Sequence, residues 1–475
     1  MKKSIVRITC FLLILGSILG YVNKIFKVKY GDGIYGVTKF YELEKNTVDV
    51  LFLGSSHAFE NFNTGTLWDE YGMASYILAG SVQPMWNTYH YLKEALKTQR
   101  PELIVLEGYM TRYEEEFADD SRIIKNNYGL HWSKNKIESL KISIPKDRWE
   151  EFFLEYTQYH TRYRELNVTD FLRNQNNKMY DDWKGFGCNM ATMPMESIDV
   201  SGIENRLELN EKTEKYYRLT IELAQEFDIP IVVIISPYPD IDDCDQQKFN
   251  TAGDIAAEYG VPFLNCNLEL DEIGIDYSTD AADASHLNYK GNQIYSKFIG
   301  NYLKENFVIS DRRNDSSYAS WQRSAEYTAQ MINNQEFLES RDISQILVKI
   351  ENPNYWVFIT IDGDCHTGDS NLQYLFYDLG IYEKETGGMW YKTKDEIMFV
   401  SEGSEEEKYI HTDKYDFCMR SIKYDDGKYK NSLIINKKQY LQVSNGVNIV
   451  VYDTVTEKIV DAIGIDMDDN YTLVR

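Results

Sequence analysis

Five short apolar runs constrain the fold of this 475-residue chain more than any other feature. They are continuous and rich in Val, Ile and Leu, as is typical of strands buried on both faces of a parallel sheet. Segments with helical spacing of apolar residues separate them. The alternation predicts an α/β domain with three layers, α/β/α, around a mainly parallel five-stranded sheet. The expected strands lie within 48–54, 74–80, 103–109, 229–236 and 261–266, and the expected helices within 83–99, 211–227, 246–259 and 288–304.

The boundaries of this domain follow from changes in pattern. We assign it to residues 29–308, with the alternation itself over about 45–305. Residues 117–205 break the rhythm with polar and aromatic sequence, and we interpret them as an insertion near the top edge of the sheet, a candidate lid. Residues 309–342 look like a polar linker that runs into a helix. From residue 343 to 475 the sequence predicts a smaller α+β domain, made mostly of strands, with "QILVKIE" as its first strand and a helix near "DSNLQYLFYDLG".

The N-terminus predicts a membrane anchor. Two lysines and Arg7 precede a mostly apolar run from Ile8 to Val22. The run is short for a span, but the two residues before Arg7 lengthen it if that side chain reaches the interface. A cleavable signal needs small residues before the cut, and the first alanine of the chain is Ala58. We therefore expect residues 1–28 to be an uncleaved signal-anchor rather than a cleaved signal. The protein would then be single-pass in the cell membrane, with its main body extracytoplasmic.

Composition excludes some partners and cofactors. The formal net charge is −25, whereas nucleic-acid binding needs clustered Lys and Arg, so we expect no nucleic-acid partner. No two of the six cysteines have C-x-x-C spacing and the histidines other than His286 are isolated, so the sequence predicts no metal site and no cofactor. One disulfide between Cys365 and Cys418, and scattered free thiols, both fit the cysteine spacing.

The end of the first predicted strand carries candidate nucleophiles. In "LFLGSSHA", Gly54 permits a sharp turn and Ser55 and Ser56 follow it. A serine hydroxyl is a poor nucleophile until a base takes its proton, and that base needs a third group to orient it. The G-x-S-x-G elbow is absent because Ala58 stands where its last glycine would be. By itself this junction is more often an ordinary turn.

A base and its orienting group lie near the end of the same domain. In "DASHLNYKGN", Asp283 precedes His286 by three residues, directly before a predicted helix. This spacing lets the carboxylate reach the imidazole Nδ1 while Nε2 faces a pocket. By itself His286 would more often be a surface or helix-capping histidine.

Together, the order and context of "LGSSHA" and "DASHLNYKGN" resemble the SGNH (GDSL-type) hydrolase superfamily over about residues 45–305. The resemblance implies that Ser56, rather than Ser55, is the nucleophile, that His286 is the base and that Asp283 orients it. It also implies that the backbone N–H of Gly80, in "ILAGSVQP", contributes to an oxyanion hole.

One superfamily feature is missing. The third block normally supplies an asparagine as an oxyanion donor, but here the third strand ends in "LEGYMTRY". Asn87 and Arg112 are candidate substitutes. The loss resembles the divergent branch that acylates cell-envelope polymers, whose members are anchored or exported and often act beside a membrane-bound O-acyltransferase.

Three further residues are candidates for the pocket. We expect His57, which follows the nucleophile, to line the entrance or to pack. Glu107 at a strand end is either a buried carboxylate with a raised pKa or a hydrogen-bonded structural residue, and Tyr109 lies beside it.

In the C-terminal domain, "YWVFITIDGDC", "MWYKTKDEIMFVSEG" and "GVNIVVYDTVTEKIVDAIGID" resemble the interleukin-like EMT-inducer fold (ILEI-like domain). Such domains are regarded as glycan- or partner-binding modules, and a purely structural domain is the alternative.

Two functions remain open on the sequence. The first is a serine O-acyltransferase or O-acyl esterase that acts on a surface polysaccharide or another glycan through an acyl-enzyme on Ser56. The second is a non-catalytic glycan-binding or scaffold protein on an SGNH-like fold. The missing asparagine favours the second function, and the intact Ser, His and Asp favour the first.

Overall fold

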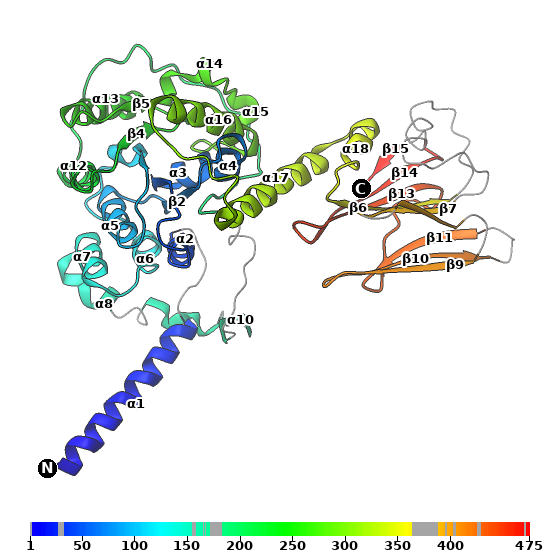
Figure 1. The fold of residues 1–475 in the computed structure, drawn as a ribbon, viewed down its shortest axis with the longest axis horizontal. Helices are drawn as coiled ribbons and strands as arrows, with labels where there is room; N and C mark the ends of the chain where they lie inside the picture. Colours follow the sequence, from blue (N-terminus) through cyan, green and yellow to red (C-terminus); the bar gives the residue numbers. More distant parts are fainter. Residues whose placement is uncertain are drawn as a thin grey trace. The chain divides into compact units, whose positions relative to one another are not determined.

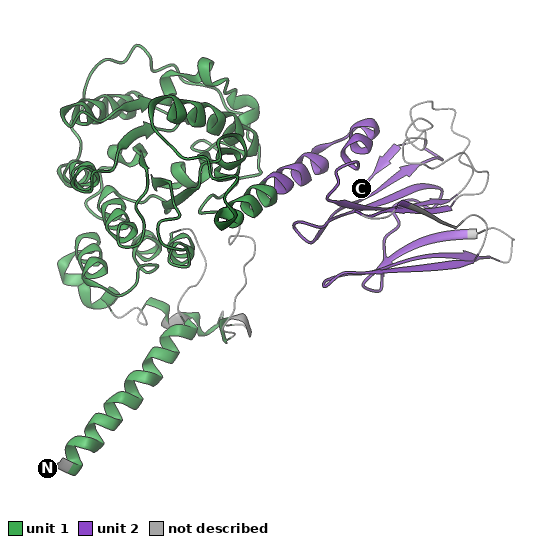
Figure 2. Ribbon diagram, in the orientation of Figure 1, with its two compact units in different colours: residues 1–328 green, residues 329–475 purple. Residues whose placement is uncertain are grey.

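A computed structural model describes most of the chain. It covers residues 2–26, 33–153, 158–164, 166, 168–171, 183–362, 388–394, 397–401, 405–424, 429–469 and 472–475. The chain forms two compact units, residues 1–328 and 329–475 (Figure 2). The division falls within one helix, α17 (Ala319–Glu339), in the region expected to be a linker that runs into a helix.

The first unit begins with α1 (Lys2–Phe26). Its stretch from Lys3 to Phe26 is long and apolar enough to cross a membrane or to act as a signal sequence. Its apolar side chains, such as Phe11 and Leu13, are exposed. A bilayer or a secretion apparatus would remove this apolar surface from water.

Five strands form one parallel sheet, as the apolar runs predict. They are β1 (Val50–Gly54), β2 (Ser75–Ala79), β3 (Leu103–Glu107), β4 (Ile231–Ile235) and β5 (Phe263–Asn265), in the order β2-β1-β3-β4-β5. Figure 1 labels β2, β4 and β5 of this sheet among the helices of the first unit. Every position of β1 to β4 is buried, which explains why these strands read as continuous apolar runs.

This strand order creates a switch point at the centre of the sheet. From β1 the chain first adds β2 on one side, and it later adds β3 on the other. In open parallel sheets, ligands bind at the carboxyl ends of the strands where the order reverses. The carboxyl end of β1, where Ser55 and Ser56 follow, is therefore the expected position for a site.

The principal helices of this unit include α5 (Met85–Ala95), α12 (Glu211–Glu226), α13 (Asp243–Glu258) and α16 (Tyr289–Asn306), of which the last three begin at side-chain caps. Asn210, Asp242 and Asn288 each accept a backbone N–H of the first turn of α12, α13 and α16. Asn288 also donates to Thr279 O over 2.8 Å, so the cap of α16 holds the loop that carries His286.

The insertion at 117–205 is partly helical. It contributes α6 (Asp120–Asn127), α7 (Lys134–Ser143) and α8 (Trp149–Phe153). Its last part, 183–205, is largely irregular and passes the edge of the sheet, where Ile77 N in β2 donates to Lys184 O over 3.0 Å. Sequence periodicity did not indicate this placement.

The second unit contains two antiparallel sheets. The larger has the order β15-β14-β13-β6-β7-β8 and the smaller β12-β11-β10-β9. An apolar cluster joins them, with Phe358 and Tyr391 from the larger sheet against Phe417 and Leu433 from the smaller. The strands are β6 (Tyr355–Asp362), β7 (Gly388–Lys392), β8 (Ile397–Ser401), β9 (Glu406–His411), β10 (Asp416–Lys423), β11 (Tyr429–Ile435), β12 (Lys438–Gln439), β13 (Gly446–Asp453), β14 (Lys458–Asp466) and β15 (Thr472–Val474).

One expected strand of this unit is wrong. "QILVKIE" belongs to α18 (Ile343–Lys349), which Asp342 caps by accepting from Ser344 N. Its apolar residues Ile343, Ile346, Leu347 and Ile350 recur at helical spacing and contribute to a core cluster with the larger sheet. The helix expected at 369–380 lies outside the described residues, as does Cys365. The described cysteines, Cys10, Cys188, Cys244, Cys266 and Cys418, are free thiols.

Candidate active site

The chain turns sharply between β1 and the short helix α3 (Ser56–Asn61). Gly54 has φ +153°, and a Cβ at this position would lie 2.8 Å from the Cβ of Glu107. A larger residue would therefore strain the turn and clash with β3. The hydroxyl of Ser55 caps α3 by accepting from His57 N over 3.3 Å. This turn leaves Ser56 as the first residue of the helix, at the carboxyl end of the central strand.

Three side chains from distant parts of the sequence meet here. Ser56 Oγ lies 2.8 Å from His286 Nε2. His286 Nδ1 lies 3.0 and 3.1 Å from the two carboxylate oxygens of Asp283. If Nδ1 carries the proton and donates it to Asp283, Nε2 is left to accept the Ser56 hydroxyl proton.

Asp283 is itself held in place. Its Oδ1 accepts the backbone N–H groups of Ser285 at 2.7 Å and of His286 at 3.0 Å. Partial burial alone would raise the pKa of Asp283, but these hydrogen bonds and the neighbouring imidazole lower it below its ordinary value. The carboxylate therefore stays ionised and can stabilise a protonated His286.

Buried hydrogen bonds hold the two sequence motifs together. Asn61 Oδ1 at the end of α3 accepts from Leu287 N over 3.1 Å. Asn63 N donates to Ser296 Oγ over 2.7 Å, and Asn63 Nδ2 donates to Asn292 Oδ1 over 3.2 Å. These bonds join the segment after β1 to α16 and its preceding loop, so the Ser56–His286 distance depends on a buried scaffold.

Ser55 has a structural role. It is fully buried and caps α3, and it is one of the groups that lower the pKa of the neighbouring Glu107 carboxyl. Glu107 is also fully buried, and its Oε1 accepts from Tyr109 N over 3.0 Å. Burial raises the pKa of Glu107 to about 8, although hydrogen bonds from Tyr109 and Ser236 N–H oppose the shift. Both expectations for Glu107 therefore apply: it is hydrogen-bonded and its pKa is raised.

His57 packs beside His286 and does not line an entrance. The residue is 1% exposed, and its ring stacks on that of Tyr109 with the ring centroids 3.5 Å apart. Its centroid lies 5.2 Å from that of His286. Burial, and then the charges of His286 and Arg112, hold the pKa of His57 well below its ordinary value. A neutral ring at this position adds no positive charge beside His286.

The two candidates for the missing oxyanion donor are engaged elsewhere. Arg112 donates from Nη1 to Asp245 over 2.6 Å and from Nη2 to Tyr109 Oη. Asn87 donates from Nδ2 to Asn127 at 3.2 Å and to Ser139 and Ser143 at 3.0 Å each. The Asn87 amide thus anchors the helical insertion to α5, and the hydrogen bonds of neither side chain include Ser56 or His286.

Another asparagine lies beside Gly80. Asn126 in α6 is fully buried and donates from Nδ2 to Ser81 O over 3.2 Å. A Cβ at Gly80 would clash with Asn126 Oδ1. Asn126 therefore fixes the turn that carries the expected oxyanion N–H. The sequence did not indicate it because it lies in the insertion, which has no strand or motif pattern.

Sequence reasoning also missed Glu60, a second carboxylate near the histidine. Glu60 Oε2 lies 3.9 Å from His286 Nδ1, and its side chain is 18% exposed, against 45% for Asp283. It follows Ser56 by four residues in α3, so both lie on the same helical face. That spacing was visible in the sequence and could have suggested it.

Comparisons with known proteins find no protein-family model and no curated protein sequence that match this chain. Among the residues described above, no group of three or more His, Cys, Asp or Glu side chains is arranged to hold a metal ion. The case for a function therefore rests on the geometry of the site.

Proposed function

We propose that this protein is a serine-dependent O-acyltransferase or esterase that acts on a cell-surface polysaccharide. Ser56 is the nucleophile, His286 the base and Asp283 the group that orients it. The observation that carries the proposal is the connected series of contacts from Ser56 Oγ to His286 Nε2 at 2.8 Å and from His286 Nδ1 to Asp283 at 3.0 Å. A serine next to an oriented, partly exposed histidine is the arrangement that activates a hydroxyl for acyl transfer.

The reaction has two steps. His286 takes the Ser56 proton as Oγ attacks the carbonyl carbon of an acyl ester or thioester donor. His286 then returns the proton to the leaving group, and the acyl group remains on Ser56. A sugar hydroxyl (transfer) or water (hydrolysis) next gives its proton to His286 and attacks the acyl carbon. The Ser56–acyl bond breaks and Oγ recovers its proton. The N–H of Gly80 is the proposed donor to the oxyanion in both steps.

The parallel sheet, helix α1 and the C-terminal unit extend this proposal to the fold, location and partners of the protein. The parallel sheet with the site at its switch point is consistent with a three-layer domain of the SGNH type. The apolar helix α1 is consistent with a single-pass protein of the cell membrane whose body is extracytoplasmic. A membrane-bound O-acyltransferase would then be the natural source of acyl groups. The C-terminal unit, with its two antiparallel sheets, is proposed as an ILEI-like module that binds glycan or a partner.

Turnover of a simple acetyl ester tests the proposal. The full chain in detergent should hydrolyse p-nitrophenyl acetate, and intact-mass measurement after rapid quenching should detect an acetylated protein. Ser56→Ala and His286→Ala should each abolish the enzymatic rate while leaving the melting temperature close to that of the wild type. Equal rates for the wild type and Ser56→Ala would rule out this proposal and favour the non-catalytic glycan-binding alternative.

A further inference from the structure

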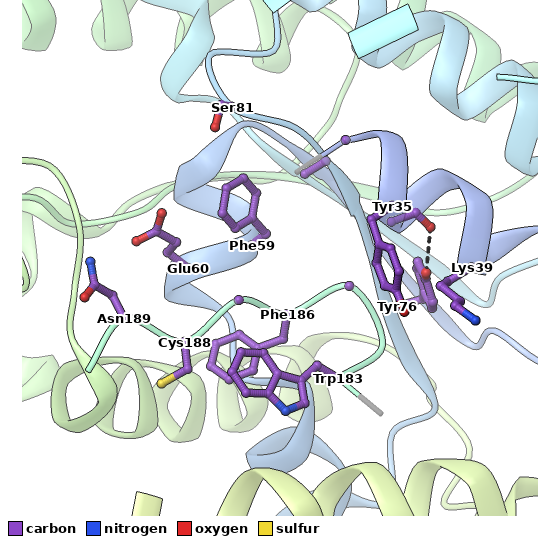
Figure 3. A pocket seen from close by; sticks show the side chains of 15 residues that line it. Tyr35, Lys39, Phe59, Glu60, Tyr76, Ser81, Trp183, Phe186, Cys188 and Asn189 are labelled. Atoms are coloured by element: carbon purple, nitrogen blue, oxygen red, sulfur yellow. Dashed lines mark hydrogen bonds between the residues drawn. The ribbon is translucent and has the colours of Figure 1, made fainter. Parts of the chain in front are cut away.

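A cavity of about 410 Å³ lies between the edge strand β2 and helices α2 (Ile34–Phe40) and α3. Figure 3 shows Phe59 and Glu60 on one side, Tyr35, Tyr76 and Lys39 on the opposite side, and Trp183 and Phe186 below. Pockets for small-molecule ligands are usually about 300–1,000 Å³ in volume. This cavity is therefore large enough for a ligand rather than only for water.

The walls of the cavity adjoin the candidate active site. Glu60 lines the cavity and also lies 3.9 Å from His286 Nδ1. Ala79 and Ser81, which flank Gly80, line it as well. A ligand in the cavity would therefore touch the helix that begins with Ser56 and the turn that carries Gly80.

Backbone contacts of the insertion complete the wall. Gly187 N donates to Phe59 O over 2.7 Å, and Tyr289 N at the start of α16 donates to Asn189 O over 3.0 Å. A Cβ at Gly187 would lie 3.1 Å from the Phe59 ring, so glycine lets this segment pass close to that side chain. Segment 183–189 is thus fastened to both elements that form the site.

The chemistry of the walls suits a sugar ring better than an acyl chain. Tyr35 and Phe59 are partly exposed aromatic rings, backed by the buried rings of Tyr76, Trp183 and Phe186. Aromatic faces carry a partial negative charge that attracts the slightly positive C–H groups of a pyranose face. The polar side chains of Glu60, Lys39 and Asn189 share the same walls. An acyl chain would remove these polar groups from water without hydrogen-bonding them, whereas sugar hydroxyls would bond them.

A second cavity continues the first along the sheet edge. It has a volume of about 500 Å³ and shares Lys39 and Tyr76 with the first cavity. Its other walls include charged and polar residues such as Glu44, Lys184 and Arg323. Two adjoining cavities with shared residues fit a chain of linked sugars better than one isolated small molecule.

We propose that the cavity lined by Tyr35, Phe59 and Glu60 binds a pyranose unit of the glycan whose hydroxyl exchanges an acyl group with Ser56. The exchange rests on the function proposed above, whereas sugar binding does not require it. In the forward direction, the bound hydroxyl gives its proton to His286 and its oxygen attacks the acyl carbon on Ser56. The Ser56–acyl bond breaks and Oγ takes the proton from His286, so the sugar leaves as its ester.

Saturation-transfer NMR on the full chain in detergent tests the site. The probes are cellotetraose, chitotetraose and maltotetraose, which share the pyranose C–H face on which the proposed recognition depends. At least one should receive saturation at its ring C–H protons from both the wild type and Ser56→Ala. Tyr35→Ala and Phe59→Leu should weaken this binding at least tenfold. Trp132→Ala is the control, because Trp132 is an exposed ring outside the residues that line the cavity.

Each outcome has a defined meaning. Absence of binding to all three sugars, or full binding by Tyr35→Ala and Phe59→Leu, would overturn the sugar site. If p-nitrophenyl acetate turnover persisted in that case, the proposed enzyme function would stand without it. Sugar binding that depends on Tyr35 in a protein without ester turnover would instead keep the site and overturn the enzyme function. Tyr35 is partly exposed, so its variant keeps the test valid if Phe59→Leu fails to fold.

Discussion

Ser56 and Glu60 lie one helical turn apart on α3 and approach opposite nitrogens of the same imidazole. Ser56 Oγ is 2.8 Å from His286 Nε2, and Glu60 Oε2 is 3.9 Å from His286 Nδ1. One short helix therefore supplies both the proposed nucleophile and a carboxylate near the far side of the base. Asp283 shares that side at 3.0 Å.

The two carboxylates should act together. Asp283→Asn removes the hydrogen-bonded partner and should lower kcat for p-nitrophenyl acetate by about 10²–10⁴-fold, because the imidazole loses its oriented tautomer. Glu60→Gln removes only a longer-range charge and should lower kcat by about tenfold. This loss corresponds to about 1.4 kcal/mol of activation free energy. The double variant should approach the rate of Ser56→Ala. A Glu60→Gln enzyme with unchanged rate in both backgrounds would remove Glu60 from the mechanism.

Substitution of Ser56 should lower activity, whereas substitution of Ser55 should lower stability. Ser56→Ala should lower ester turnover by about 10⁴-fold or more, as for other triad nucleophiles, with little change in melting temperature. Ser55→Ala removes the cap of α3, worth about 1 kcal/mol, and a partner of Glu107. It should therefore lower the melting temperature while keeping turnover within a few-fold of the wild type. Loss of turnover in a folded Ser55→Ala protein would count against the assignment of Ser56 as nucleophile.

Asn126→Ala should restore part of the activity that Gly80→Ala removes. Gly80→Ala places a methyl group against Asn126 Oδ1 and should distort the turn, which lowers kcat. Asn126→Ala in the same protein removes the clash and should restore part of the lost activity, because position 80 still offers its backbone N–H. Asn126→Ala alone is the control for loss of the bond to Ser81 O. A double variant no better than Gly80→Ala would show that the clash is not the cause.

Glu107 should make stability depend on pH. Its pKa is about 8 in the folded protein and near its ordinary value of 4.5 in the unfolded chain. Its contribution to the free energy of unfolding is therefore complete below pH 4.5 and is lost as the pH rises through 8. Between these two pH values the free energy of unfolding falls by about 1.4 kcal/mol per pH unit. Glu107→Gln should melt with a smaller difference between about pH 5 and about pH 8 than the wild type. Identical pH dependence of the two proteins would contradict a raised pKa.

The sequence predicted best those elements whose buried positions form a regular local pattern. Strands β1 to β4 could be predicted because both faces are buried. The proximity of Ser56 and His286 could be predicted because a doubly wound sheet brings the end of its first strand beside the loop before its last helix. By contrast, α18 was mistaken for a strand because a short apolar run with Ile346 and Leu347 fits either structure.

Features that depend on tertiary packing could not be predicted from the sequence. Asn126 and segment 183–189 lie in the insertion, where no periodicity shows which part will meet Gly80 or Phe59. The roles of Asn87 and Arg112 were equally hidden, because their partners Asn127 and Asp245 are far along the chain.

Covalent labelling of Ser56 tests the central claim most directly. A fluorophosphonate reacts with a serine only when a base activates its hydroxyl. Incubation of the full chain with such a probe, followed by peptide mass spectrometry, should find the label on Ser56 in the wild type and in Ser55→Ala. His286→Ala should label at least a hundred-fold more slowly. A wild-type protein that stays unlabelled at Ser56, or that labels equally fast without His286, would contradict the account.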